Sequence, residues 1–201
     1  MSDARQRLIV AVSGASGSLL GLRLLQLLNQ VKGWETHLVL SSAAILTAKL
    51  ELNETRETFE SLVTHVHNNK DIGASIASGS FRTAGMVVIP CSMNTLSAIA
   101  NGASSNLITR SADVTLKERR KLVLVTREAP LNLIHLRNMT LATEAGAIIM
   151  PPVPSFYLGP CSLDDAVTQM AGRVLDQFNI DVPSMKRWDG TAQASTVGQS
   201  I

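Results

Sequence analysis

The 201-residue chain has few aromatic residues and almost no excess of either charge. Aromatic side chains make up 3% of the sequence, and the formal net charge is only +2. The basic residues occur singly or in short groups without aromatic residues between them, unlike the surface of a nucleic-acid-binding protein. The chain also lacks any apolar run near the roughly 20 residues that a membrane helix needs. We therefore expect neither nucleic acid nor a membrane as a partner.

Cysteines and acidic clusters are scarce as well. The two cysteines, Cys91 and Cys161, lie far apart and outside any spacing typical of a metal site. The first residues lead directly into a predicted strand without an apolar leader segment, so we expect reduced thiols and a cytoplasmic location. Without an aspartate-rich motif, positive side chains rather than Mg²⁺ are expected to neutralise any bound phosphate. We expect no metal.

What the chain has in abundance is aliphatic residues, arranged as alternating strand-like and helix-like segments. The strand-like runs are apolar throughout, as expected when helices cover both faces of a sheet. This alternation predicts an α/β fold with a doubly wound, mostly parallel sheet, in which ligands bind beyond the carboxyl ends of the strands. The expected strands are 8–12, 36–40, 86–89, 122–125 and 147–150, and the expected helices are 20–28, 43–52, 95–100, 107–119, 131–145 and 163–178.

The more polar residues 53–80 predict only a short helix near 57–63 and a loop through 67–71. A chain of this length is expected to form one domain, over residues 1–188. The Gly/Ser/Thr/Gln-rich residues 189–201 predict a disordered tail.

A glycine turn directly after the first predicted strand indicates a phosphate site. Ser13-Gly14-Ala15-Ser16-Gly17 places free backbone N–H groups at the start of the following helix. The glycine spacing is not G-x-G-x-x-G, and the second strand ends in Ser41-Ser42 where a dinucleotide-binding protein would have an acidic residue. Hydroxyl groups at the strand ends favour a single phosphate attached to a polar ring system, such as FMN. These residues are Ser13, Ser16, Ser41, Ser42, Ser92 and Thr95.

Several of these positions also have a purely structural interpretation. Ser92 is a good N-cap for the helix that follows it. Arg110, Asp113 and Lys117 share one face of a predicted helix, where they would form a solvated ion-pair ladder. Arg127-Glu128 is harder to explain in this way, because a cation and a carboxylate directly follow a buried strand.

In combination, the motifs of the chain resemble those of the UbiX-type flavin prenyltransferases. The resemblance extends from about Leu8 to Trp188. The segments that carry it are Ser13-Gly14-Ala15-Ser16-Gly17, Ser78-Gly79-Ser80-Phe81, Pro90-Cys91-Ser92 with Thr95-Leu96, Arg110 and Asp113 with Leu116-Lys117-Glu118-Arg119-Arg120, Arg127-Glu128-Ala129-Pro130 and Pro154-Ser155-Phe156-Tyr157.

The resemblance implies a Rossmann- or flavodoxin-like enzyme that alkylates reduced FMN with dimethylallyl monophosphate, without a metal. Bonds form at N5 and C6 of the flavin, and the product, prenyl-FMN, passes to a UbiD-type decarboxylase. The family implies a homododecamer with the flavin between subunits.

The resemblance also implies roles for individual residues. Glu51 with Ser16 would manage the flavin N5 proton, Glu128 would be the acid/base beside the phosphate, and Trp188 would line the prenyl pocket. The implied FMN contacts are Gly14, Ala15, Ser16, Ser41, Ser92, Met93, Asn94, Thr95 and Arg127. The implied contacts to dimethylallyl phosphate are Arg110, Lys117, Tyr157 and Arg173, with Lys117 counted among the catalytic residues.

Two other functions remain open at this point. An FMN-dependent decarboxylase of the cysteine type shares the expected fold, but that chemistry uses a histidine after the first helix, whereas His37 lies inside the second predicted strand. A non-catalytic flavin carrier serving an aromatic acid decarboxylase would need no second phosphate site. Lys117, Glu128, Tyr157 and Arg173 together favour catalysis over carriage.

Overall fold

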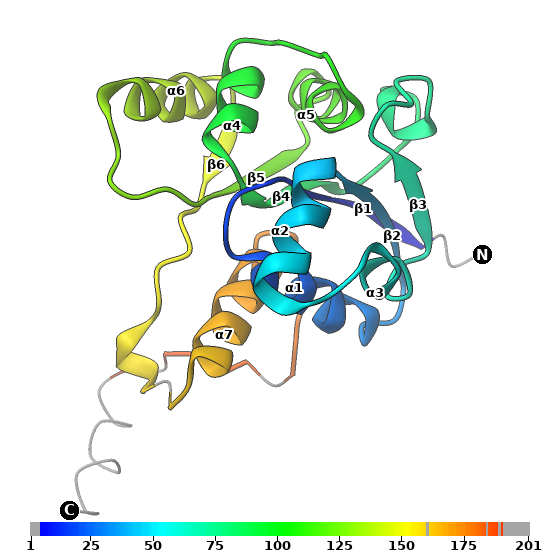
Figure 1. Cartoon of the computed structure of the whole chain (residues 1–201). Helices are drawn as coiled ribbons and strands as arrows, with labels where there is room; N and C mark the ends of the chain where they lie inside the picture. The colour runs from blue at the N-terminus through cyan, green and yellow to red at the C-terminus, as the bar shows by residue number, and fades with distance from the viewer. Residues whose placement is uncertain (1–4, 160, 184, 189, 191–201) are drawn as a thin grey trace, which may run out of the picture.

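The computed structural model describes residues 5–159, 161–183, 185–188 and 190. Strands and helices alternate along most of the chain, as the apolar pattern predicts (Figure 1). The strands are β1 (Gln6–Val12), β2 (Trp34–Leu40), β3 (His65–Asn68), β4 (Gly85–Cys91), β5 (Lys121–Thr126) and β6 (Ala147–Ile149). The α-helices are α1 (Ser18–Asn29), α2 (Ser42–Leu52), α3 (Arg56–Glu60), α4 (Met93–Ala100), α5 (Leu107–Lys117), α6 (Leu133–Glu144) and α7 (Leu163–Asp176).

Within the described residues the strands form one six-stranded sheet in the order β3-β2-β1-β4-β5-β6. Every paired neighbour in it is parallel. Without the short edge strand β3 this is the flavodoxin order, and with β3 it is the Rossmann order, so the predicted doubly wound α/β fold is confirmed. The order reverses between β1 and β4, which places the expected ligand crevice beyond the carboxyl ends of these two strands.

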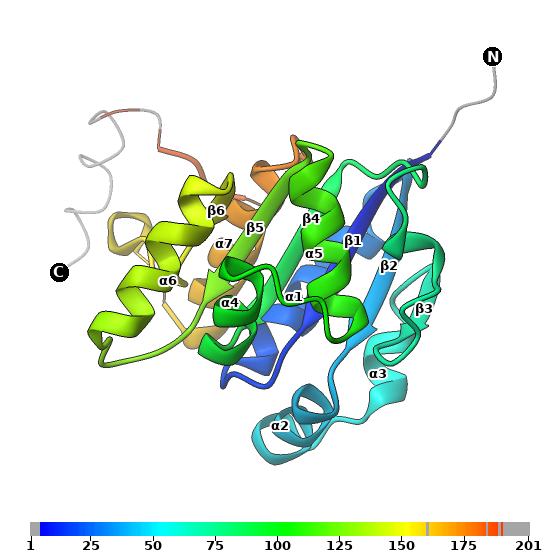
Figure 2. The ribbon, with the colours of Figure 1, turned by 90° about the horizontal axis from the view of Figure 1, so that it is seen from above.

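Alternate residues of the central strands pack into different cores, because successive side chains of a strand point to opposite faces. Leu8, Val10 and Val12 pack with α1 and α7, whereas Ile9 and Ala11 pack in the core that holds the α4 and α5 side chains. Figure 2 shows α4, α5 and α6 on one face of the sheet and α1 and α7 on the other. The prediction that helices cover both faces is therefore confirmed.

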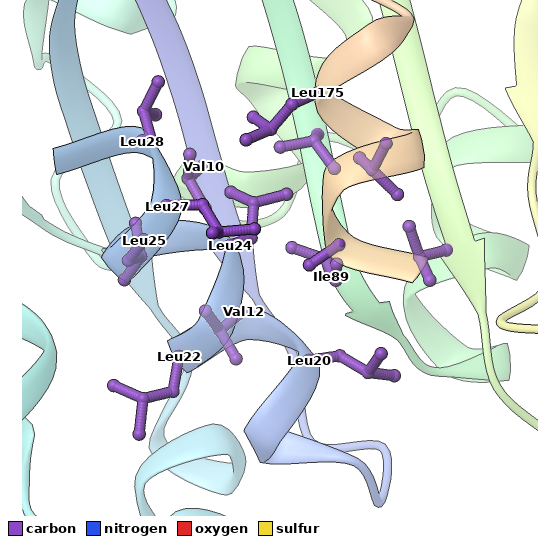
Figure 3. Packing of buried hydrophobic residues seen from close by; sticks show 14 of the residues in the cluster. Val10, Val12, Leu20, Leu22, Leu24, Leu25, Leu27, Leu28, Ile89 and Leu175 are labelled. Atoms are coloured by element: carbon purple, nitrogen blue, oxygen red, sulfur yellow. The ribbon is translucent and has the colours of Figure 1, made fainter. Parts of the chain in front are cut away.

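Helix α1 is leucine-rich because it packs against both the sheet and α7. Leu24 and Leu28 are fully or almost fully buried. Figure 3 shows the α1 leucines beside Val10 and Val12 of β1, with Leu175 of α7 nearby. Burial of a leucine side chain stabilises a fold by about 1.5–3 kcal/mol, so this cluster fixes the strand-to-helix turn that follows β1.

The structure corrects one part of the expected fold. Residues His65–Asn68 form β3, although the first two residues of the predicted 67–71 loop fall within it. The strand lacks an apolar pattern because it is the outer strand of the sheet and is mostly exposed. The predicted 189–201 tail lies outside the described residues apart from Gly190. Within the described part of the chain, no helix is both long and apolar enough to cross a membrane.

Candidate active site

A cavity of about 350 Å³ lies beyond the carboxyl ends of β1, β2 and β4. Three helices begin at its wall, because the residues that precede α2, α4 and α5 all line it. Helix N-termini carry partial positive charge and unpaired N–H groups, so their convergence favours an anion such as a phosphate. The lining residues are Ser13, Gly14, Ser41, Ala43, Asn69, Ser92, Asn94, Thr95, Asn106 and Ile108.

The capping and ligand-binding interpretations of these polar residues are compatible. Ser41 accepts a hydrogen bond from the Ala44 N–H at 3.0 Å, and Ser92 accepts one from the Thr95 N–H at 3.3 Å. Asn106 caps α5 in the same way. The caps of α2 and α4 each satisfy one N–H of their helix and leave others at the cavity wall, where they can contact a ligand.

Ser13 joins the ends of β1 and β4, the two strands between which the strand order reverses. Its buried hydroxyl donates to the Pro90 carbonyl at 2.9 Å and accepts from the Ser92 N–H at 2.8 Å. The neighbouring Gly14 allows close approach of α2, since a Cβ atom at this position would lie 2.4 Å from the Ala43 Cβ. The turn after β1 is therefore shaped for packing as well as for a ligand.

In the glycine turn, the N–H groups at the N-terminus of α1 are not available to a phosphate. The Glu51 carboxylate, from the end of α2, accepts hydrogen bonds from the Gly17 N–H at 3.0 Å and the Ser18 N–H at 2.8 Å. A carboxylate already occupies the place that the sequence pattern indicates for the phosphate. The free N–H groups of the first cavity lie instead at the N-termini of α2 and α4.

Glu51 and Ser16 come together, as the resemblance implies. Partial burial acts to raise the pKa of the Glu51 carboxyl, but hydrogen bonds from the Ser16 side chain and from the Ser18 and Gly17 backbone outweigh it, so the pKa lies below its ordinary value. Glu51 is therefore ionised at neutral pH.

We expect Glu51→Gln to lower the melting temperature at pH 7 and to have a smaller effect in acid, as the pH falls through the folded-state pKa of Glu51. The folded-state pKa is depressed, so the carboxylate contributes stability above its unfolded pKa of about 4.3 and loses it as pH falls through the folded value. Thermal unfolding of both proteins across this range measures the difference. Glu144→Gln, at an exposed position of α6, is the control. A pH-independent difference would contradict the ionised cap.

A second cavity, of about 260 Å³, lies at the same edge of the sheet on the α1 and α7 side. Its walls are largely apolar, with Leu20, Ile89 and Val125 from α1, β4 and β5. Tyr157 and Arg173 add a phenol and a guanidinium. This combination suits a small apolar group attached to an anion.

The residues around this second cavity form defined contacts. The Tyr157 and Trp188 rings meet edge to face, with centroids 5.5 Å apart. Arg173 pairs with Asp176, which also accepts two hydrogen bonds from Arg187. Three of the predicted residues, Tyr157, Arg173 and Trp188, are thus neighbours in the fold.

The structure does not bring Arg110 and Lys117 to this cavity within one chain. Arg110 pairs with Asp113 at 2.8 Å, as the ion-pair interpretation predicts. Lys117 ends α5 and pairs with Glu118 rather than Asp113. Helix α5 starts at the first cavity, and its 11 residues span about 16 Å. Lys117, at its last turn, therefore lies near the opposite end of the sheet, where the strands begin. Within a single chain the four residues do not line one crevice, so their common contact to dimethylallyl phosphate stays a prediction.

The remaining predicted residues lie around the carboxyl edge of the sheet, the end at which the strands finish. Arg127 and Glu128 follow β5 and are exposed, and the Glu128 carboxylate accepts a hydrogen bond from the Ala129 N–H at 3.1 Å. Asn94 and Thr95 line the first cavity. Ala15 is buried in the turn after β1, and Met93 packs against the core on the α4 side.

Sequence reasoning missed Asn69 and Asn106, which line the first cavity. Asn106 has a recognisable signal, because Asn-x-x-Thr before an apolar helix predicts the capping box that it forms with Thr109. Asn69 has none. Its carbonyl and side-chain oxygens accept hydrogen bonds from the Leu107 and Ile108 N–H groups, contacts between segments far apart in the chain.

Comparison with known proteins agrees with this geometry. Residues 1–173 match the model of the Flavoprotein family. The chain is 54% identical over 187 residues to "Flavin prenyltransferase UbiX" of Escherichia coli (strain K12), covering 92% of this chain and 99% of that protein. It is 52% identical over 187 residues to the protein of the same name from Thauera aromatica, covering 93% of this chain and 96% of that one.

A solved structure is also similar throughout. A crystal structure of AnUbiX (PadA1) in complex with FMN and dimethylallyl pyrophosphate superposes with a TM-score of 0.90 at 49% identity, covering 92% of this chain and 98% of that one. A dodecameric FMN-dependent UbiX-like decarboxylase from Escherichia coli O157:H7 has the same TM-score of 0.90 at 48% identity, covering 92% of this chain and 100% of that one. This chain belongs to the UbiX flavin prenyltransferases within the Flavoprotein family.

Proposed function

We propose that this protein transfers a dimethylallyl group from dimethylallyl monophosphate to reduced FMN, forming bonds at N5 and C6 of the flavin. The observation that carries the proposal is the pair of cavities at the carboxyl edge of one sheet. One cavity is built for a phosphate, and the other combines apolar walls with a guanidinium and a phenol. Two anionic substrates that must react with each other can therefore bind side by side.

The first cavity fits the phosphate end of FMN. The N-termini of α2 and α4 and the Ser41, Ser92 and Thr95 hydroxyls supply donors without any metal. Gly14, Asn94 and Arg127, at the same edge of the sheet, are proposed to complete the contacts. Reduced FMN supplies the nucleophile when bound.

The second cavity fits the dimethylallyl phosphate. Arg173 and Tyr157 hold the phosphate as it departs, and fixed positive charge there stabilises the transition state. The apolar walls exclude water from the allylic cation, and the Tyr157 and Trp188 rings offer π faces to it. Glu128 donates or accepts the proton at the phosphate, and Glu51 with Ser16 accepts the proton released at the flavin.

Arg110 and Lys117 join the site from a neighbouring copy of the chain. In one chain they do not line the cavity that holds Tyr157 and Arg173, and the dodecameric state of the related Escherichia coli O157:H7 protein supports assembly between copies. The exposed side chains of Leu133, Ile134 and Leu136 on α6 give this chain apolar surface for such contacts. We propose a homododecamer in the cytoplasm that passes its product to a UbiD-type decarboxylase.

The mass of the flavin tests the proposed reaction. The protein is incubated anaerobically with reduced FMN and dimethylallyl monophosphate, and the extracted flavin is weighed by mass spectrometry. We expect a gain of one C5H8 unit. An unchanged flavin with release of CO₂ from a cysteinyl peptide would support a cysteine decarboxylase, and an unchanged flavin without any reaction would support a carrier. The same assay with dimethylallyl pyrophosphate measures the preference for one phosphate over two.

We expect Arg173→Ala to raise the KM for dimethylallyl monophosphate by roughly 10- to 100-fold, because a hydrogen bond to a charged group is worth about 1.5–3 kcal/mol. Arg187→Ala is the matched control. Arg187 shares the partner Asp176 but does not line the second cavity. Steady-state kinetics of both variants make the comparison. Equal KM increases in the two variants would show that the increase comes from loss of the ion pairs with Asp176 rather than from loss of a phosphate contact.

A further inference from the structure

The pairing of β2 with the outer strand β3 brings several histidines together. His37 lies opposite His65, and Val39 lies opposite His67. Because alternate residues of a strand point to the same face, Glu35 and His37 of β2 share that face with His65 and His67 of β3. The proposed prenyl transfer uses none of these four residues.

The four side chains are close enough to share an ion. The His37 Nδ1 lies 3.0 Å from the His67 Nε2, and the His37 and His65 rings stack with centroids 4.6 Å apart. Ligand atoms of Glu35, His37 and His65 all lie within 4.8 Å of one another. A tetrahedral zinc ion with Zn–N bonds of about 2.0–2.1 Å needs its ligand atoms roughly 3.3 Å apart, so a small side-chain movement closes the site.

One nitrogen of the cluster lacks any partner among the described residues. His37 is 3% exposed, and its Nε2 is buried without a hydrogen bond. When Nδ1 donates to His67, Nε2 carries the free lone pair that a metal ligand needs. Metal-binding histidines commonly donate their other ring N–H in this way.

The surrounding charges can accommodate a cation. Glu35 Oε2 accepts a hydrogen bond from the Arg7 Nε at 2.8 Å, which leaves Oε1 for another partner. The Arg7 guanidinium is itself held over the Phe81 ring, 4.7 Å from its centroid. The Asp71 carboxylate also interacts electrostatically with His67. The two carboxylates therefore partly offset the positive charge of Arg7 and an added divalent ion.

We propose that Glu35, His37 and His65 bind a divalent transition-metal ion such as Zn²⁺, with His67 holding the His37 ring. The ion joins the edge strand β3 to β2. From His65 the chain runs about 13 Å to Asn69, which anchors α5 and lines the first cavity. The ion thereby steadies this wall of the flavin site from a distance and takes no part in the transfer.

Calorimetric titration of the full chain, prepared without a histidine tag, with Zn²⁺ tests the site. We expect one ion per chain and a higher melting temperature with Zn²⁺. His65→Val removes a ligand but keeps a residue suited to a strand, and Glu35→Gln removes the carboxylate. Each is expected to weaken Zn²⁺ binding about 100-fold or more, since loss of even an outer partner costs 10- to 100-fold.

His135→Gln and Cys161→Ser are the matched controls, because they remove possible Zn²⁺ ligands outside the cluster. Both are expected to bind Zn²⁺ as the unmodified chain does. Absence of Zn²⁺ binding to the unmodified chain would overturn the proposal. Unchanged binding by His65→Val and Glu35→Gln would overturn it equally.

Discussion

Glu128→Gln is expected to retain FMN and to lose turnover by about 10²- to 10⁴-fold, the usual contribution of a general acid or base. Glu128 follows β5 at the carboxyl edge of the sheet, and its Oε1 accepts the Ala129 N–H. A glutamine keeps that hydrogen bond, so the loop conformation is preserved while the ionisable proton is removed. Flavin absorbance measures binding, and single-turnover formation of the heavier flavin measures the chemistry.

Glu144→Gln, which neutralises an exposed glutamate of α6, is the control for this substitution. It is expected to react at the normal rate. Normal turnover by Glu128→Gln would show that protonation of the departing phosphate does not depend on this residue.

Chains that carry Lys117→Ala and chains that carry Arg173→Ala are expected to rescue one another. Lys117 lies near the opposite edge of the sheet from Arg173 in the same chain, so both reach one phosphate only when two copies meet. The two variants are co-expressed with different tags and co-purified as mixed oligomers. Their activity is measured at a substrate concentration below KM, where each variant alone is nearly inactive.

If copies mix at random, about a quarter of the sites between chains receive both intact residues. Mixed oligomers are therefore expected to recover about a quarter of normal activity. A mixed oligomer no more active than the mean of the two variants would show that the site lies within one chain.

The central part of the fold was predictable because its strands are apolar on both faces. The run Leu8–Val12 is buried throughout, and so are most residues of β2, β4 and β5. The edge strand β3 was not predictable, since His65 and His67 are polar and partly exposed. A strand of this kind is specified by its pairing with β2 rather than by its own composition.

The site was predictable at the ends of the strands and less so elsewhere. Ser41 and Ser92 directly follow buried strands, which places them at the crevice of any doubly wound sheet. The contact of Glu51 with the α1 N-terminus joins residues more than thirty positions apart, and no local pattern reveals it. The separation of Lys117 from Arg173 follows from the direction of α5, which is a property of the topology.

A crystal structure of the assembled protein with FMN and dimethylallyl monophosphate tests most directly whether the two cavities hold two phosphates. The FMN phosphate is predicted at the N-termini of α2 and α4, with Glu51 still bound to α1. The second phosphate is predicted between Arg173 and Tyr157 of one chain and Lys117 of another. An FMN phosphate at the α1 N-terminus in place of Glu51, or a dimethylallyl phosphate bound away from Arg173, would contradict this arrangement.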